Sequence, residues 1–336
     1  MAFPNPLAQL PSAMHPFEYH RPVSLDAALD ALAAPHAVPL GGGTDLLVAM
    51  REQLVRAEHL VDVRRLPGAR EIAARPDGAA RVGGAVRLAD LAAHPAIRER
   101  FAALAQAARA VGTPALRNMG TIAGNLCQRP RCWYFRRGIA CFKSGASACP
   151  AEEGENQYHA ILDADACHAV HPSDPAVALV ALEATVEIAA RGGARRSVPI
   201  AEFYAGAASN PRGETVLAPG ELIEAVELPA EAAGGAQRYV KLMQRGAWDF
   251  ALVSLAALRR ADGEVRLVLG GVALRPYRVT RSVEEDVAVG GLDDASVEAL
   301  AERALHDAKP LALNSYKVRQ AAALLREAMR WLSRAP

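Results

Sequence analysis

The cysteines of this chain are gathered in one segment, and their spacing constrains its fold more than any other feature. Cys132, Cys141, Cys149 and Cys167 fall within 36 residues, and the fifth cysteine, Cys127, lies just before them. Thiolates gathered in this way need a cation, and the candidates are zinc or the iron of an iron–sulfur cluster. A segment held by a metal can be ordered without a hydrophobic core of its own.

The gaps between the four cysteines favour a cluster over zinc. Structural zinc sites usually contain cysteine pairs two to four residues apart, whereas eight, seven and seventeen residues separate these cysteines. Five basic residues and no acidic residue lie between Cys127 and Ala151, and nearby cations stabilise the negative charge of a four-thiolate cluster. Zinc, disulfides and unrelated buried thiols remain alternatives. Cys127 itself is typical of a small buried apolar residue.

Length, charge and composition exclude several classes of protein. A chain of 336 residues is longer than a single hydrophobic core usually supports, so its length predicts two or three domains. The net charge of +1 indicates no nucleic-acid partner. We expect no membrane span, because no apolar run approaches about 20 residues. The N-terminus lacks the pattern of a secretory signal, so we expect a cytoplasmic protein, or a periplasmic one exported together with a partner that carries a signal.

Patterns along the chain predict an α+β protein in two parts. Residues 1–13 are rich in proline and predict an N-terminal extension. Strand and helix patterns alternate from residue 14 to about 230, which predicts a mixed α/β domain interrupted by the cysteine segment at 127–167. Residues 231–336 predict a smaller α+β domain. Its expected elements are strands at 237–244 and 264–273, a helix at 251–259, and two helices in the tail.

A glycine-rich loop is the first candidate for ligand binding. Gly41, Gly42 and Gly43 precede Thr44 and Asp45, and the loop joins a predicted strand to a predicted helix. Successive N–H groups in such a loop can surround a diphosphate, and the helix N-terminus adds a favourable field. The pattern is neither a Walker loop nor a Rossmann fingerprint. A flexible turn with a helix cap is the alternative interpretation.

Two further motifs place small and polar residues near predicted helix starts. Residues 117–125 read Arg-Asn-Met-Gly-Thr-Ile-Ala-Gly-Asn, a composition that allows close backbone packing around a polar ligand. Ser173 and Asp174 precede a proline and predict a capped helix start. His168 and His171 lie near Cys167 and are candidate metal ligands. The more ordinary interpretation is that each is exposed to solvent or lies next to the ligands without binding the metal. We find no catalytic triad, zinc-protease motif or paired carboxylates.

In this order, the motifs resemble the FAD-binding medium subunit of molybdenum hydroxylases, the group that contains the xanthine dehydrogenase and carbon monoxide dehydrogenase flavoproteins. The resemblance extends from about residue 16 over nearly the whole chain, and it also includes Glu221-Leu222-Ile223 and Lys241. The cysteine segment is similar to the one in the flavin subunit of bacterial periplasmic aldehyde oxidoreductase. In such subunits, four cysteines bind a 4Fe–4S cluster.

The resemblance implies two cofactors and assigns residues to each. The FAD-binding domain would cover residues 14–230 in two subdomains, and a domain like the C-terminal domain of the carbon monoxide dehydrogenase flavoprotein would cover residues 231–336. The 4Fe–4S ligands would be Cys132, Cys141, Cys149 and Cys167. The residues around FAD would be Val38, Pro39, Leu40, Gly41, Gly42, Gly43, Thr44, Asp45, Leu46, Thr121, Gly124, Asn125, Asp174, Ile223 and Lys241. No catalytic residue would lie in this chain.

The function implied by the resemblance is electron transfer within a heterotrimeric molybdenum-containing aldehyde oxidase or dehydrogenase. A large partner would carry the molybdenum cofactor and a small partner the 2Fe–2S centres. Electrons would reach FAD in this chain and pass to an external acceptor. Two other functions remain open. One is a self-sufficient FAD oxidase of the same fold, and the other is a zinc-stabilised scaffold without redox function.

Overall fold

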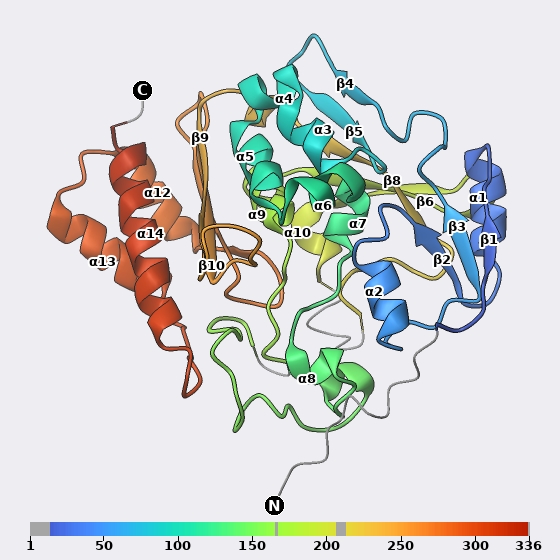
Figure 1. Ribbon diagram of the computed structural model, residues 1–336. Helices are drawn as coiled ribbons and strands as arrows, with labels where there is room; N and C mark the ends of the chain where they lie inside the picture. The colour runs from blue at the N-terminus through green and yellow to red at the C-terminus, as the bar shows by residue number, and fades with distance from the viewer. Residues whose placement is uncertain (1–13, 165–166, 206–212, 335–336) are drawn as a thin grey trace, which may run out of the picture.

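Three sheets follow one another along the chain, each with its own helices (Figure 1). The computed structural model describes residues 14–164, 167–205 and 213–334, so the predicted extension at 1–13 lies outside the described residues. The mixture of helices with parallel and antiparallel strands confirms the predicted α+β class. None of the helices in the described ranges is both long and apolar enough to cross a membrane.

The first sheet is parallel and lies at one end of the molecule. Its strand order is β1-β3-β2, with β1 at Glu18–His20, β2 at Ala37–Leu40 and β3 at His59–Asp62. Helix α1 (Leu25–Leu32) is capped by Ser24, whose hydroxyl oxygen accepts from the Ala27 N–H at 3.2 Å. Helix α2 (Leu46–Arg51) follows β2. The glycine loop therefore lies at the carboxyl end of a parallel strand, where α/β proteins commonly bind ligands.

The second sheet has five antiparallel strands in the order β4-β5-β8-β6-β7. These strands are β4 (Ile72–Ala74), β5 (Ala80–Gly83), β6 (Thr185–Ala189), β7 (Arg195–Pro199) and β8 (Leu222–Leu228). The helices of this part are α3 (Leu88–Ala93), α4 (Pro95–Arg100), α5 (Ala102–Ala110), α6 (Pro114–Met119), α7 (Ile122–Leu126), α9 (Asp174–Ala181) and α10 (Ile200–Phe203). The chain breaks between α3 and α4, and Pro95 is the first residue of α4.

The cysteine segment connects α7 to α9 and contains little regular structure in its described residues. Its described helical elements are α8 (Trp133–Arg136) and the 3-10 turn η2 (Phe142–Ser144). Figure 1 shows the segment below the main body of the molecule, beside α2. Other short 3-10 turns are η3 (Arg191–Gly193) and η4 (Ala230–Ala232).

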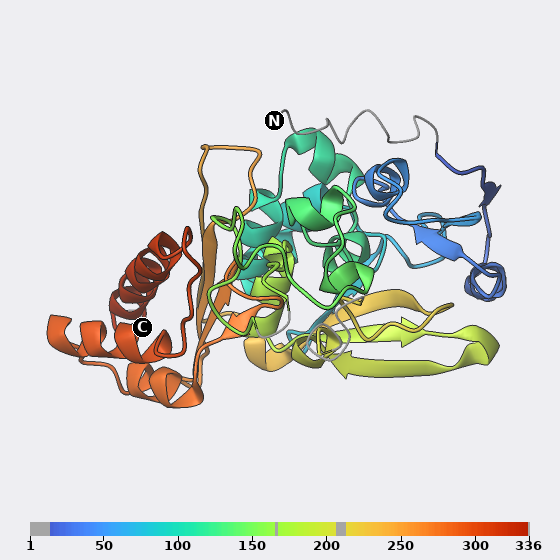
Figure 2. The ribbon, with the colours of Figure 1, turned by 90° about the horizontal axis from the view of Figure 1, so that it is seen from below.

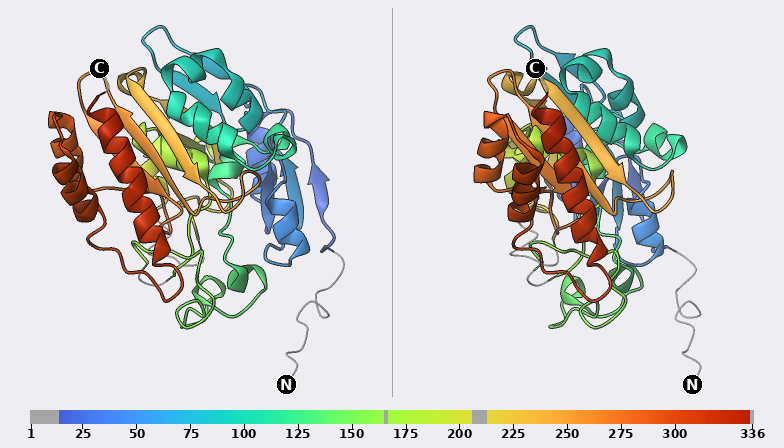
Figure 3. Two further views of the ribbon diagram at one scale, coloured as in Figure 1. Left: turned by 60° about the vertical axis from the view of Figure 1, so that its left-hand side comes forward. Right: turned by 90° about the vertical axis from the view of Figure 1, so that its left-hand side faces the viewer.

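The third sheet is antiparallel, in the order β12-β11-β10-β9. Its strands are β9 (Ala236–Leu242), β10 (Val253–Arg259), β11 (Val265–Gly270) and β12 (Tyr277–Arg278). Three helices accompany it, namely α12 (Arg281–Val289), α13 (Asp294–Ala304) and α14 (Tyr316–Leu332). Figure 3 shows α14 lying along one face of the sheet. The tail therefore holds α12 in addition to the two predicted helices.

The helix predicted at 251–259 is wrong, because Val253–Arg259 forms the central strand β10. The error has a physical cause. The run Val-Ser-Leu-Ala-Ala-Leu has no alternation, since both faces of the strand are buried. Ala256 and Leu258 belong to the core around α5 and α9, whereas Leu255 and Ala257 belong to the core beneath α14. A strand buried on both faces cannot be told from a buried helix by periodicity alone.

Helix α9 lies between the second and third sheets and unites their cores (Figure 2). All eight of its residues are buried. The same hydrophobic cluster contains Val177 and Leu179 of α9, Val186 of the second sheet and Val268 of the third. The predicted domain boundary near residue 231 therefore falls within a continuous hydrophobic cluster.

Candidate functional site

A cavity of about 530 Å³ lies among the glycine loop, the start of α7, the start of α9 and strand β9. Most residues predicted for the FAD site line it, namely Val38, Pro39, Gly41, Gly42, Gly43, Thr44, Asp45, Leu46, Thr121, Gly124, Asn125, Asp174 and Lys241. Ile223 lines a smaller adjoining cavity of about 130 Å³, which shares Pro39, Gly41 and Thr121 with the first. Leu40 is buried and pairs with Asp62 in the sheet, so it supports the loop from behind.

The glycines bring the loop into close contact with a second segment of backbone. A Cβ atom at Gly42 would overlap the carbonyl oxygen of Met119, and one at Gly41 would lie 2.6 Å from Thr121 Oγ1. Gly43 adopts a φ of 72°, a conformation that favours glycine. The two walls of the cavity can approach this closely only because these side chains are absent.

The start of α7 forms the second wall, and hydrogen bonds connect it to α9. Thr121 caps α7, with its hydroxyl oxygen accepting from the Gly124 N–H at 3.2 Å. The Ser173 hydroxyl donates to Asn125 Oδ1 at 2.6 Å and accepts from the Ala176 N–H at 3.1 Å. Ser173 is thus both the cap of α9, as predicted, and the support of Asn125.

Asp174 and Lys241 form a buried ion pair at the edge of the cavity. Lys241 Nζ lies 2.8 Å from Asp174 Oδ2, and the Tyr239 hydroxyl donates to Asp174 Oδ1 at 2.6 Å. Burial raises the pKa of Asp174, although Lys241 and Tyr239 act in the opposite direction. The pair joins the first turn of α9 to strand β9. It therefore fixes the relative positions of two walls of the cavity.

The carboxylate of Asp45 points to the cysteine segment and binds its arginines. Asp45 Oδ1 lies 2.7 Å from Arg131 and 2.9 Å from Arg136, and Oδ2 accepts from the Arg129 N–H at 2.9 Å. These contacts compensate the negative charge of Asp45 next to the glycine loop. They also connect the first wall of the cavity to the segment that carries the cysteines.

Two aromatic side chains on the cavity wall were not predicted from the sequence. Trp248 and Phe250 follow β9, line the cavity and are 62% and 46% exposed. The Arg131 guanidinium lies over the Phe250 ring, 4.9 Å from its centroid. The sequence signal is two aromatic residues close together, Trp248 and Phe250, just after a predicted strand.

Cys132, Cys141, Cys149 and Cys167 line one small cavity, together with Lys143. The structure thus brings the four predicted ligands together and separates them from Cys127, which caps α7 and lines the large cavity. Tetrahedral zinc with Zn–S distances near 2.3 Å would hold its sulfur ligands about 3.8 Å apart. Within the described residues, no three cysteine sulfurs lie within 4.8 Å of one another.

Hydrogen-bond donors surround the cysteine sulfurs. The backbone N–H groups of Tyr134 and Phe135 donate to Cys132, and the N–H of Ala169 donates to Cys167. Burial raises the pKa of the Cys167 thiol to about 11, while the Ala169 N–H and the charge of Lys143 act in the opposite direction. Donors and positive charge are what thiolate ligands of an iron–sulfur cluster require.

Of the nearby histidines, the one in contact with a cysteine is His159. Its Nε2 lies 3.3 Å from Cys132 Sγ, and burial lowers the pKa of His159 to about 4. The candidates from the sequence have other partners, since His168 lies 3.4 Å from Glu152 and His171 packs against Tyr204. His159 is eight residues from Cys167 along the chain, and no local sequence signal marked it.

A third cavity of about 370 Å³ lies between the two sites. Cys132, Trp133 and His159 line one part of it. Asp174 and Phe250 line it as well, and both also belong to the large cavity. The cysteine site and the large cavity are therefore neighbours in space.

Residues 15–231 of this chain match the protein family described as "FAD binding domain in molybdopterin dehydrogenase". The aldehyde oxidoreductase FAD-binding subunit PaoB of Escherichia coli K12 is 40% identical over 309 residues, which cover 91% of this chain and 94% of that protein. The putative xanthine dehydrogenase FAD-binding subunit XdhB of the same organism is 29% identical over 300 residues, covering 87% and 86%.

A solved structure gives the same result for the fold. This chain superposes with a TM-score of 0.72 on a chain of carbon monoxide dehydrogenase from Hydrogenophaga pseudoflava, in a form that lacks the Mo-pyranopterin moiety. The two are 25% identical, and the match covers 96% of this chain and 99% of the other. This chain therefore belongs to the family of FAD-binding medium subunits of molybdenum hydroxylases, and it is an oxidoreductase subunit.

Proposed function

We propose that the large cavity holds FAD. The glycine loop and the start of α7 would face the diphosphate, because their backbones approach closely and their glycines leave room beside the N–H groups. Asp45 would not repel the diphosphate, since Arg131 and Arg136 already compensate its charge. Ile223, which lines the adjoining cavity, would pack on the flavin or adenine ring of FAD. The paired Asp174 and Lys241 would offer polar atoms on the opposite wall.

We further propose that Cys132, Cys141, Cys149 and Cys167 hold a 4Fe–4S cluster. The observation that supports this most directly is that the four line one cavity, although up to 17 residues separate neighbours in the sequence. A cluster binds each thiolate through a different iron, so it tolerates wider sulfur spacing than a single zinc ion does. The N–H donors at Cys132 and Cys167 suit bound thiolates.

The function that follows is electron transfer within a molybdenum-containing aldehyde oxidoreductase. Bound FAD supplies one- and two-electron chemistry, and this chain positions it and shields it from water. A large molybdenum subunit, a small 2Fe–2S subunit and an external acceptor would complete the complex. Aldehyde as the substrate class rests on the name of the 40% identical relative. We place the complex in the cytoplasm, or in the periplasm after export with a signal-bearing partner.

Iron and flavin analysis of four cysteine variants tests the assignment. We expect Cys132→Ser, Cys141→Ser, Cys149→Ser and Cys167→Ser each to lower the iron content that belongs to this chain. Cys127→Ser is the matched control and should keep it, because Cys127 lines the other cavity. Zinc in place of iron in a colourless protein would support the scaffold hypothesis. Iron loss with Cys127→Ser alone would contradict the assignment.

Copurification separates the subunit hypothesis from the self-sufficient oxidase. We expect a tagged chain, expressed with its genomic neighbours, to bring down a molybdenum-containing subunit and a 2Fe–2S subunit. Aldehyde turnover should then require all three chains, while this chain alone should retain flavin and show no turnover. Substrate oxidation by the isolated chain would support the oxidase hypothesis.

A further inference from the structure

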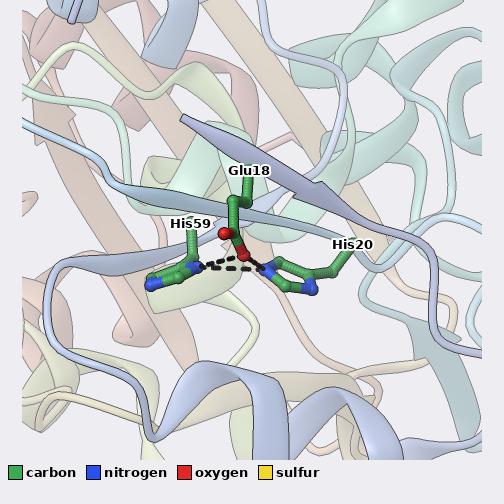
Figure 4. Close-up of side chains that lie close together, drawn as sticks. All are labelled: Glu18, His20 and His59. Atoms are coloured by element: carbon green, nitrogen blue, oxygen red, sulfur yellow. Dashed lines mark hydrogen bonds and ion pairs between the residues drawn. The ribbon is translucent and has the colours of Figure 1, made fainter. Parts of the chain in front are cut away.

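Glu18, His20 and His59 form a compact cluster on the first sheet (Figure 4), and none of the three lines the large cavity or the cysteine cavity. His20 Nε2 lies 3.0 Å from His59 Nδ1. Glu18 Oε2 lies 3.6 Å from the first of these nitrogens and 3.4 Å from the second. Three potential ligand atoms therefore converge on one point, and the other nitrogen of each ring points away from it.

The register of the parallel sheet builds this arrangement. Glu18 of β1 pairs directly with His59 of β3. His20 lies two residues further along β1, and side chains at i and i+2 project from the same face of a strand. The backbone thus places the three side chains on one face. The side chains of His20 and His59 are 35% and 25% exposed, so the cluster is partly shielded and still open to an ion from solution.

The separations match the coordination of a transition metal. Nitrogen and oxygen ligands lie about 2.0–2.2 Å from zinc, which places tetrahedral ligand atoms roughly 3.4 Å from one another. The three observed separations, from 3.0 to 3.6 Å, surround this value. Two imidazoles and one carboxylate are a common protein ligand set for zinc and similar ions, with the fourth position left to water.

Without a metal, the two rings can hydrogen-bond to each other only if at least one of them is neutral. If both rings were protonated, two imidazolium groups would face each other at 3.0 Å, and a single exposed carboxylate would have to balance them. If at least one ring is neutral, one ring can donate its N–H to the other, and Glu18, whose side chain is 72% exposed, is hydrated. A divalent cation balances the carboxylate and binds both nitrogen lone pairs at once.

On the opposite face of β1, side-chain hydrogen bonds connect this strand to β3. The Tyr19 hydroxyl donates to Asp62 Oδ2 at 2.6 Å, and Arg64 also binds that carboxylate. On the face of Glu18 and His20, an ion would provide the corresponding connection between β1 and β3. Because β1 has only three residues, such a connection would add to the backbone pairing and the Tyr19 hydrogen bond that hold this strand at the sheet edge.

We propose that Glu18, His20 and His59 bind a divalent transition-metal ion, with Zn²⁺ as the expected occupant, and that this ion fastens β1 to β3. The site is separate from the cysteine site in both position and ligand chemistry. It takes a hydrated ion from solution without any redox step, and its fourth position remains available to water.

Zinc titration of the complete, iron-replete protein tests the proposal. At a free Zn²⁺ concentration buffered in the micromolar range, we expect the wild type to bind one zinc equivalent more than His59→Gln or His20→Gln. Glu18→Gln should weaken zinc binding at least tenfold while preserving the size of the side chain. His306→Gln is the matched control, because His306 is exposed and lies in the C-terminal part; it should bind as the wild type does.

A second measurement keeps the test valid if a variant is less stable. Cu²⁺ added to the oxidised wild type should give an electron paramagnetic resonance spectrum with nitrogen hyperfine splitting from two imidazoles, which His20→Gln or His59→Gln should change. Zn²⁺ should also raise the thermal stability of the wild type and leave that of His59→Gln unchanged. Equal zinc content in the wild type and the double variant His20→Gln/His59→Gln, at equal iron content, would overturn the proposal.

Discussion

At the scale of single residues, charged side chains near the large cavity are already paired within the protein. Asp45 is bound by Arg131 and Arg136, and Asp174 is bound by Lys241. The sequence suggested that these acids contact a ligand directly. In the structure, Asp45 and Asp174 form ion pairs that hold the walls of the large cavity in place. An anionic cofactor can enter such a site because no unpaired carboxylate would face it from these two positions.

Gly42 has the most restricted position in the glycine loop. We expect Gly42→Ala to weaken FAD binding at least tenfold, about 1.4 kcal/mol or more, because its Cβ would overlap the Met119 carbonyl and separate the two walls. Gly246→Ala is the matched control, since a Cβ there meets open space. The measurement is the flavin dissociation constant of each variant. Unchanged affinity in Gly42→Ala would contradict a role for this close contact.

Asp62 makes the free energy of unfolding depend on pH in the acid range. Burial raises its pKa, but hydrogen bonds from Arg64 and Tyr19 outweigh that effect and hold the pKa well below its usual range. The unfolded chain therefore binds more protons below pH ~4, and the contribution of Asp62 is lost as the pH falls. We expect Asp62→Asn to lower the free energy of unfolding by about 2 kcal/mol at pH 7, and by less at pH 3.

Denaturant unfolding at several pH values measures this difference. Asp307→Asn provides the control, because the Asp307 side chain is 76% exposed and should change stability little at any pH. A loss in Asp62→Asn that is the same at pH 3 and pH 7 would show that the carboxylate charge is not the cause.

At the scale of elements, the cysteine segment and the glycine loop behave as one unit. Arg136 of α8 is the central connection, because it binds Asp45 at 2.9 Å and donates to the carbonyl oxygens of Pro130 and Arg129 at 2.8 and 2.9 Å. Its side chain is only 11% exposed. A segment without a core of its own is thereby connected to the loop that we propose for FAD.

Arg136→Met tests this connection while keeping a side chain of similar length. We expect lower iron and lower flavin content together, because the segment and the loop lose their shared ion pair. Stability should fall by about 3 kcal/mol, the range for breaking a partly buried pair. The exposed neighbour Arg137 supplies the control variant Arg137→Met. Iron loss with full flavin content would show that the two sites are independent.

At the scale of the whole molecule, α9 makes one body out of the second and third sheets. Its apolar residues contact the third sheet directly, and its first turn carries Asp174, which binds Lys241 of β9. Gly270, at the end of β11, lies directly against the helix, since a Cβ there would be 2.5 Å from Val177 Cγ2. The wall of the large cavity thus depends on the packing of the two sheets around α9.

We expect calorimetry to show α9 and both neighbouring sheets unfolding in one transition. Gly270→Ala should destabilise the protein by about 1–3 kcal/mol, because the added methyl group overpacks this contact. The transition temperature should fall on the order of 2 °C per kcal/mol, and the transition should remain single. Gly246→Ala again serves as control. Two separate transitions would show that residues 231–336 unfold independently.

The features of this protein that depend on local chemistry can be read from its sequence. The glycines at 41–43, the cap at Ser173 and the gathered cysteines each act over a few residues, so their patterns are visible in one dimension. The family followed from these motifs and their order, and most of the residues expected around FAD line the large cavity.

Which distant groups meet depends on how the chain folds in three dimensions. The partners of Asp45 lie more than 80 residues away along the chain, and His159 reaches Cys132 through the folding of an irregular segment. Strand β10 lost its alternation because two separate cores bury it. Glu18 and His20 meet His59 through the pairing of β1 with β3. Such contacts depend on strand pairing and packing between distant segments, which no local pattern encodes.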